Sequence, residues 1–200
     1  MSATCRHALR RELPAIVDAL IAGFMDDPLY RWLYPASETR PACLRETFAL
    51  ITDAAFERGH LYTNRDKTAA AAWTAPDVPL LDGDGEQAFV DMIRRHIGDR
   101  YESVLAGMAA VRRHAPSESH FALHNVAVHA ASQGRGVGAA LLAPVLSRCD
   151  EDGLVAHLDS SNPRNVAFYE RLGFVPVAEV QVPADGPVMR SMTRAPGQAR

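Results

Sequence analysis

The chain has 200 residues, of which 48% are hydrophobic and 22% charged, and this composition predicts a single soluble globular domain spanning residues 1–200. The formal net charge of −3 gives no indication of nucleic-acid binding, and no apolar run approaches the roughly 18 residues needed to span a membrane. Three cysteines without CxxC spacing fit neither a disulfide framework nor a zinc site, so we expect a cytoplasmic protein without a metal centre.

The first half of the chain is expected to be mainly helical, with one hairpin. Apolar residues recur at helical spacing from Leu13 to Phe24, and Pro28 disfavours helical geometry in the residue before it. "HLYT" and "KTAAAAWT" predict two strands joined by a turn, although the alanine run would also suit a helix. The segments expected here are an edge strand at 5–9, helices at 13–24, 29–35 and 40–58, strands at 60–63 and 67–74, and a helical segment at 87–113 broken near Gly98.

The second half is expected to alternate strands and helices. "HFALHNVAV" predicts a strand at 120–128, and a glycine-rich turn then leads into a helix that ends near Cys149. The remaining elements expected are a strand at 155–159, a helix at 165–172 and strands at 174–182 and 188–192.

Three glycines alternate in the sequence "QGRGVG", at the junction between the strand at 120–128 and the next helix. The P-loop pattern GxxxxGK[ST] is excluded because no lysine follows, and the dinucleotide pattern GxGxxG has a different spacing. N–H groups at a helix start attract anions, and glycine lets a phosphate approach the main chain. The turn is therefore either an anion site to which Arg135 adds charge or a connection that needs glycine for its geometry.

A second cluster, "DSSNPRNVAFYERLGF", runs from Asp159 to Phe174. Asn162 or Asn165 is suited to cap its short helix, and Gly173 is suited to end it. Tyr169 shares the helical spacing of the apolar residues, and this spacing alone indicates a core aromatic side chain.

The two motifs together, in this order and spacing, resemble the GNAT superfamily of N-acetyltransferases. "QGRGVG" is similar to the family's [Q/R]xxGx[G/A] loop for the acyl-CoA pyrophosphate, and "NPRNVAFYERLGF" is similar to its NxxNxxFYExxGF element. The stretch from about 114 to 197 also resembles the puromycin N-acetyltransferases, whereas the first half is less similar. The resemblance implies an α/β fold with a mixed, mostly antiparallel central sheet, splayed middle strands and helices on both faces.

The resemblance also implies acetyl-CoA as the acetyl donor. The main chain of Val126 to Val128 would pair with the pantetheine amides, and the N–H groups of the glycine turn would hold the pyrophosphate. Asn162 would contact the pantetheine arm, and helix capping is its structural alternative. The full set expected at the cofactor is Val126, Ala127, Val128, Gln133, Gly134, Arg135, Gly136, Val137, Gly138, Ala139, Asn162 and Asn165.

Three residues are expected to take part in the chemistry. Tyr169 matches the family tyrosine that points at the CoA sulfur, where it would protonate or hydrogen-bond the departing thiolate. His124 and Asp159 are candidates for the base, acting directly or through a bound water. Their structural alternatives are a hydrogen-bonded histidine and a helix-capping aspartate. The family chemistry needs no metal ion.

Asp26 and Asp27 lie where the family places a loop on the substrate side, and their carboxylates would attract a cationic amine. The alternative is that they only end a helix and form a turn before Pro28. Tyr30, Trp32 and Trp73 are candidates for an aromatic pocket, although such residues more often complete a core. The helical segment at 87–113 is expected to cover or flank the acceptor site.

We therefore expect an acetyl-CoA-dependent N-acetyltransferase acting on the amine of a small molecule. The narrow hypothesis is an aminonucleoside antibiotic such as puromycin, and hence antibiotic resistance. The alternatives are an amino-acid derivative, a polyamine or a protein N-terminus as acceptor, and a catalytically silent acyl-CoA-binding module. Retention of Tyr169 and of the complete glycine turn argues against the silent module. No nucleic acid or membrane partner is expected, and a homodimer is left open.

Overall fold

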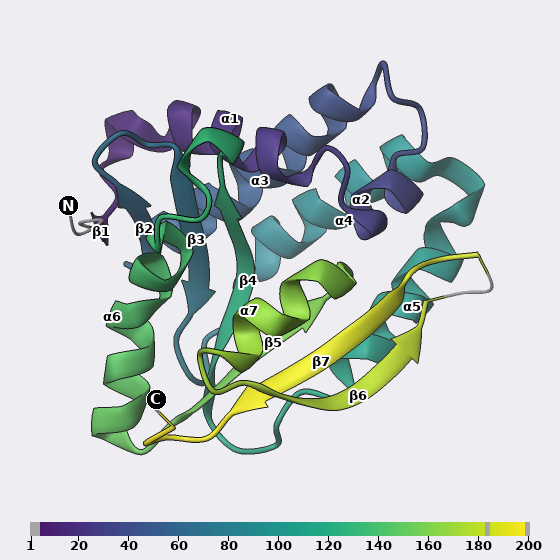
Figure 1. Cartoon of the computed structure of the whole chain (residues 1–200). Coiled ribbons are helices and arrows are strands. Elements are labelled where there is room, and N and C mark those ends of the chain that lie inside the picture. The colour runs from purple at the N-terminus through teal and green to yellow at the C-terminus, as the bar shows by residue number, and fades with distance from the viewer. Residues whose placement is uncertain (1–4, 183–184, 199–200) are drawn as a thin grey trace.

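The computed structural model describes residues 5–182 and 185–198. It is built on a seven-stranded sheet in the order β1-β2-β3-β4-β5-β7-β6 (Figure 1). Neighbouring strands are antiparallel except β4 and β5, which are parallel. The strands are β1 (Cys5–His7), β2 (Leu61–Asn64), β3 (Ala69–Thr74), β4 (His120–Val128), β5 (Val155–Ser160), β6 (Val175–Gln181) and β7 (Val188–Arg194).

Helices cover both faces of this sheet (Figure 1). One hydrophobic cluster joins the first five helices to one face, and a second joins α6 and α7 to the other. The helices are α1 (Leu13–Phe24), α2 (Pro28–Leu33), α3 (Arg40–Glu57), α4 (Gly83–Ile97), α5 (Tyr101–Arg112), α6 (Val137–Asp152) and α7 (Val166–Glu170).

The alanine run forms strand β3 because both of its faces are covered. Every residue of β3 is buried, with Ala70 and Ala72 in the cluster beneath α1 and α3. Ala69, Ala71 and Trp73 point the other way, into the cluster beneath α6. A strand buried on both faces shows a continuous apolar run instead of alternation, and this explains why the run fits either type of element in the sequence.

The two central strands separate halfway along their length. β4 pairs with β5 only from His120 to Leu123, opposite Val155 to Leu158. Beyond this point β4 continues along β3, and β5 continues along β7. The sheet therefore opens between β4 and β5, and the opening leaves one edge of β4 without a strand partner in the described part of the chain.

A β-bulge lies at the start of this opening. Ala72 pairs with Asn125 while its neighbour Trp73 pairs with Leu123, so His124 is an extra residue in β4. Side chains alternate along a strand, and an extra residue reverses this alternation. As a result Leu123 faces the α6 cluster, whereas Ala127, four residues later, faces the α1 cluster.

The predicted order of elements and the mixed, mostly antiparallel sheet with splayed middle strands are confirmed. The predicted break near Gly98 is confirmed, because a 3-10 turn at Gly98–Arg100 separates α4 from α5. The main difference is that α4 already begins at Gly83, whereas the helical segment was predicted from residue 87. The first turn of α4 contains Gly83 and Gly85, which are poor helix formers, so the sequence pattern does not indicate a helix start there. Asp84 and Glu86 in the same turn interact favourably with the helix dipole. In the described part of the chain, no helix has the length and apolar character needed to cross a membrane.

Candidate active site

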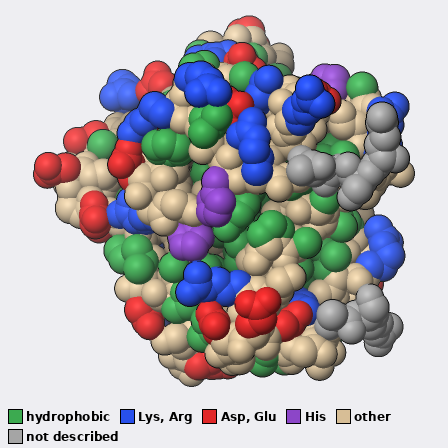
Figure 2. Space-filling model, turned by 90° about the vertical axis from the view of Figure 1, so that its left-hand side faces the viewer, with side chains coloured by type: hydrophobic (Ala, Val, Ile, Leu, Met, Phe, Trp, Pro, Cys, Tyr) green, Lys and Arg blue, Asp and Glu red, His purple; other side chains and the backbone are tan. Residues whose placement is uncertain are grey.

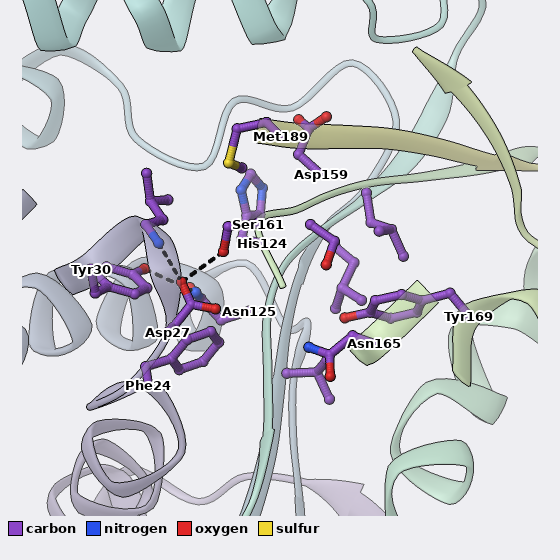
Figure 3. Close-up of a pocket in the computed structure, with 15 residues that line it drawn as sticks. Phe24, Asp27, Tyr30, His124, Asn125, Asp159, Ser161, Asn165, Tyr169 and Met189 are labelled. Carbon is purple, nitrogen blue, oxygen red and sulfur yellow. Dashed lines mark hydrogen bonds between the residues drawn. The ribbon is translucent and has the colours of Figure 1, made fainter. Parts of the chain in front are cut away.

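A pocket with a cavity volume of about 70 Å³ lies where β4 and β5 separate (Figure 3). Its walls come from the α1–α2 connection, the middle of β4, the end of β5, the region of α7 and the start of β7. The predicted residues Asp27, Tyr30, His124, Asp159 and Tyr169 all line it, although they are far apart in the sequence. None of the lining residues comes from α4 or α5, so the segment predicted to cover or flank the site does not form its wall.

The glycine turn connects β4 to α6 and is exposed to solvent. Gly134 and Gly136 have φ of 72° and 75°, in the left-handed region that glycine adopts without strain. The first backbone bond of α6 runs from Ala140 N–H to the Gly136 carbonyl, so the N–H groups of Val137, Gly138 and Ala139 have no partner inside the helix. The turn therefore presents several N–H donors at a helix N-terminus, where anions are stabilised.

Gly138 is required for close packing rather than for its backbone angle. A Cβ atom built on it would lie 3.1 Å from Cζ of Phe168, which belongs to α7. The ring thus holds the N-terminus of α6 against α7, the helix that carries Tyr169.

The inner edge of β4 has main-chain groups directed into the opening. His129 N–H bonds to the Thr68 carbonyl, and hydrogen-bonded pairs alternate along an antiparallel ladder. Residues 125 and 127 therefore direct their main-chain groups toward β3, and Val126 and Val128 direct theirs toward the opening. The Val128 carbonyl accepts a bond of 2.9 Å from Gln133 Nε2.

Tyr169 points its hydroxyl into the pocket from α7 (Figure 3). It is only 6% exposed, and burial, with the nearby charge of Asp27 as a smaller cause, raises its pKa. The hydroxyl is therefore protonated at neutral pH and can donate a hydrogen bond. Asn162, ahead of this helix, accepts a bond of 3.1 Å from Arg164 N–H, which is the capping role that the sequence offered as an alternative. Asn165 lines the pocket beside Tyr169.

His124, the bulged residue of β4, lies at the pocket wall with one ring nitrogen anchored. Its Nε2 is 3.0 Å from Oγ1 of Thr74, which is buried at the end of β3. The side chain is exposed to solvent, and desolvation by the neighbouring protein groups lowers its pKa to about 4. The imidazole is therefore neutral at pH 7, and its Nδ1 is the nitrogen available to accept a proton.

Asp159 closes the pocket at the end of β5. The Ser191 hydroxyl of β7 donates to its Oδ1, and His157 Nε2 lies 3.5 Å from its Oδ2. Both neighbours come from strands, so the carboxylate is held in a fixed orientation. It does not cap a helix through any hydrogen bond in the described part of the chain.

The neighbouring aspartates Asp26 and Asp27 have different environments. Asp26 is exposed and does not line the pocket, whereas Asp27 is 8% exposed and lines it. Asp27 Oδ1 accepts a bond of 3.0 Å from Leu29 N–H, which caps α2, and one of 2.7 Å from the Ser161 hydroxyl. Burial raises the pKa of Asp27, although these hydrogen bonds oppose the shift. The capping role and a place in the pocket therefore coexist in one side chain.

The three aromatic candidates are not grouped. Tyr30 lines the pocket, and its hydroxyl accepts a bond of 3.2 Å from Asn125 Nδ2. Trp32 lies outside the pocket, where Nε1 donates to Asp185 and the ring stacks with Arg100. Trp73 is 0% exposed in the cluster beneath α6 and does not reach the pocket.

Four polar residues of the site were not predicted from the sequence: Thr74, Asn125, Ser161 and Ser191. Asn125 alone carried a signal, because an amide in the middle of an apolar strand needs a partner or a ligand. The others depend on strand pairing and on contacts across the opening, which no local pattern encodes.

Comparison with known proteins gives consistent matches. The model of the acetyltransferase (GNAT) family matches residues 48–174. An uncharacterized N-acetyltransferase of Schizosaccharomyces pombe is 25% identical over 175 residues, which cover 78% of this chain and 68% of that protein. The family match includes β4, the glycine turn and α7.

Solved structures show the same fold over nearly the whole chain. A structure from Corynebacterium glutamicum, described as histone acetyltransferase HPA2 and related acetyltransferase, is 27% identical with a TM-score of 0.74 and covers 98% of each chain. Arylalkylamine N-acetyltransferase 2 from Aedes aegypti is similar in fold, with a TM-score of 0.64 at 11% identity over 98% of this chain and 99% of that one.

Proposed function

The chain belongs to the acetyltransferase (GNAT) family and is an N-acetyltransferase, and from this premise we propose that it transfers the acetyl group of acetyl-CoA to the amine of a small molecule. The observation that carries the proposal is the pocket itself. It joins Tyr169, His124 and two carboxylates at the point where β4 and β5 separate.

The donor side fits an acyl-CoA molecule. The exposed N–H groups of the glycine turn suit a pyrophosphate, and Gly134 and Gly136 have no Cβ atom to keep it away. The main-chain groups of Val126 and Val128 suit the amides of pantetheine, which would add to β4 in the manner of a strand. Bound there, acetyl-CoA supplies an activated acetyl group as a thioester. Gln133, Arg135 and Asn162 remain proposed contacts.

Tyr169 would assist departure of the thiolate. A thiol has a pKa of about 8.5, so the thiolate is already a fair leaving group. Because burial raises the pKa of Tyr169, complete proton transfer from its hydroxyl to the thiolate is unfavourable. We infer that Tyr169 acts mainly as a hydrogen-bond donor to the developing negative charge.

The proton of the amine would pass to His124 or to a water held by it. His124 is neutral at pH 7 and keeps Nδ1 free for this proton. Asp159 stabilises the imidazolium that results, because its charge favours the protonated form of His124. In this scheme His124 is the base, and Asp159 stabilises its protonated form.

The acceptor side favours a cationic amine. The lining residues include the carboxylates of Asp27 and Asp159 but no lysine or arginine. Phe24, Leu29 and Met189 add apolar walls to the pocket, which suit the apolar carbons next to the amine. The proteins of similar fold include an agmatine N-acetyltransferase and an arylalkylamine N-acetyltransferase, so both kinds of amine belong in a screen with puromycin, amino-acid amides and polyamines.

The test is release of CoA thiol from acetyl-CoA in the presence of each amine. We expect release with at least one small amine and a fall in kcat of about 100-fold in Tyr169→Phe, the scale of a single acid–base contribution. Tyr62→Phe is the matched control, because Tyr62 is a buried tyrosine of β2 outside the pocket. Acetyl-CoA binding without release for any amine would refute the enzymatic proposal and favour a silent binding module.

A further inference from the structure

Two hydrogen-bond acceptors beside Tyr30 are left for a ligand (Figure 3). Asn125 is 6% exposed, its Nδ2 donates to the Tyr30 hydroxyl, and its Oδ1 accepts no hydrogen bond from any residue that the structure describes. Asp27 is 8% exposed, Ser161 and Leu29 both donate to its Oδ1, and the Tyr30 backbone N–H also stabilises the carboxylate. Within the described part of the chain, no side chain donates a hydrogen bond to Oδ2.

An unpartnered carbonyl oxygen in a sheltered site is a costly feature unless something binds it. Buried polar side-chain atoms are nearly always hydrogen-bonded, and exceptions call for an explanation. Asn125 could not obtain its second bond from water without a water entering the pocket, because the atom is shielded from bulk solvent. A ligand that brings an N–H donor into the pocket would satisfy it.

The two acceptors lie close to the expected reaction centre. The charge of Asp27 contributes to the raised pKa of both Tyr30 and Tyr169, after burial as the larger cause. Asp27 and Asn125 also line the same pocket as Tyr169, whose hydroxyl is proposed to meet the leaving thiolate. An amine held by Asp27 and Asn125 would sit beside the thioester rather than at a remote subsite.

Resting on the proposed function, we propose that Asn125 Oδ1 and Asp27 Oδ2 accept the two N–H bonds of a primary amine and thereby orient its lone pair for transfer. A neutral primary amine has two N–H donors and one lone pair, so two acceptors leave only the lone pair free. His124 or its water first takes the third proton of the ammonium form, which frees the lone pair. The lone pair then forms the new N–C bond as the C–S bond breaks, and the excess proton leaves along its hydrogen bond to the Asp27 carboxylate. The substrate class is an unsubstituted primary amine.

Counting donors gives a prediction for binding. Ammonium forms of the primary, N-methyl, N,N-dimethyl and trimethyl derivatives carry three, two, one and no N–H donors. The primary and N-methyl compounds have enough N–H groups to donate to both acceptors, whereas the N,N-dimethyl compound has only one. Affinity should therefore fall when the second methyl group is added. A site built to hydrogen-bond an N–H group discriminates strongly against a ligand that lacks it, and we expect a drop of about tenfold or more.

The experiment is calorimetric titration of the 2-phenylethylamine series into the protein saturated with CoA, a complex in which no turnover occurs. In Asn125→Leu, which has a similar volume and one acceptor fewer, the drop should move from the second methyl group to the third. Asn125→Asp keeps an oxygen toward the amine and should retain the wild-type pattern. Melting temperatures of both variants show whether each is folded, and a destabilised leucine variant can be replaced by Asn125→Ala.

Each outcome is decisive. Equal affinities along the series in the wild type, or an unchanged pattern in Asn125→Leu, would overturn the proposal while leaving the acetyltransferase function in place. Loss of the pattern in both the leucine and aspartate variants would mean that the pattern does not depend on an acceptor oxygen at residue 125, and this also overturns the proposal. A donor-count pattern without CoA release from acetyl-CoA would support the inference and refute the proposed function.

Discussion

Asp27→Asn tests whether the buried carboxylate serves binding rather than folding. The substitution keeps the shape of the side chain and an oxygen that can cap α2, because asparagine caps a helix as well as aspartate does. It removes the charge that would face a cationic amine. One hydrogen bond to a charged group contributes about 1.5–3 kcal/mol, so we expect kcat/KM for a small amine to fall roughly 10- to 150-fold.

The same substitution should not weaken the fold at neutral pH. Burial raises the pKa of Asp27 in the folded protein, so the ionised form is disfavoured there relative to the unfolded chain. The free-energy cost of ionising Asp27 in the folded protein is fully present above the pKa of the folded state. It is lost as pH falls through this pKa, because the folded state then binds a proton that the unfolded chain still lacks. We expect Asp27→Asn to be more stable than the wild type at pH 7.5, and the difference should shrink under acid conditions.

Asp26→Asn is the matched control, because Asp26 is the adjacent carboxylate but is exposed outside the pocket. Its kcat/KM should change less than about threefold, the effect of one screened surface charge. Urea unfolding at several pH values gives the stability, and CoA-thiol release gives the rate. A destabilised Asp27→Asn with unchanged kcat/KM, or equal losses of activity in both variants, would refute the reasoning.

Three further substitutions test other parts of the structure. Thr74→Val removes the hydroxyl that anchors His124, and the loss of one neutral hydrogen bond should lower kcat/KM about 2- to 12-fold in the thiol-release assay. Asp150→Ala leaves Arg194, whose side chain is 2% exposed, without its bidentate partner, and should cost about 3–5 kcal/mol in urea unfolding. Gly138→Val forces α6 away from α7 and should cost about 1–3 kcal/mol in thermal unfolding while weakening CoA binding in calorimetry.

Each of these has its own control. Thr74→Ser retains the hydroxyl, so recovery of the rate separates the hydrogen bond from simple packing. Asp152→Ala breaks the exposed pair with Arg148 on the same helix, and a loss as large as that of Asp150→Ala would contradict the role of burial. CoA affinity unchanged in Gly138→Val would argue against CoA binding at the start of α6.

The sequence was sufficient where the physical signal is local. Periodicity and turn residues located the elements, and Gly134 and Gly136 adopt the left-handed angles that the glycine turn suggested. Asp26 and Asp27 show the limit of such reasoning. These two aspartates are adjacent in the sequence, yet only Asp27 is buried, where it accepts a hydrogen bond from Ser161, the residue after β5. The sequence could not decide whether Trp32 and Trp73 line a pocket or complete a core, because an aromatic side chain suits both positions.

The bulge at His124 explains why the remaining part of the site could not be predicted. Strict alternation along "HFALHNVAV" would place Leu123, Asn125 and Ala127 on one face of β4. The extra residue instead turns Asn125 toward Tyr30 and α1, while Leu123 stays beneath α6. The bulge arises from pairing with β3, a strand about 50 residues earlier, where Trp73 is fully buried opposite Leu123. The same bulge places His124, the proposed base, at the pocket. One register shift therefore determines the packing of Trp73 in the core, the position of His124 and the direction of Asn125, which is proposed to accept a hydrogen bond from the amine.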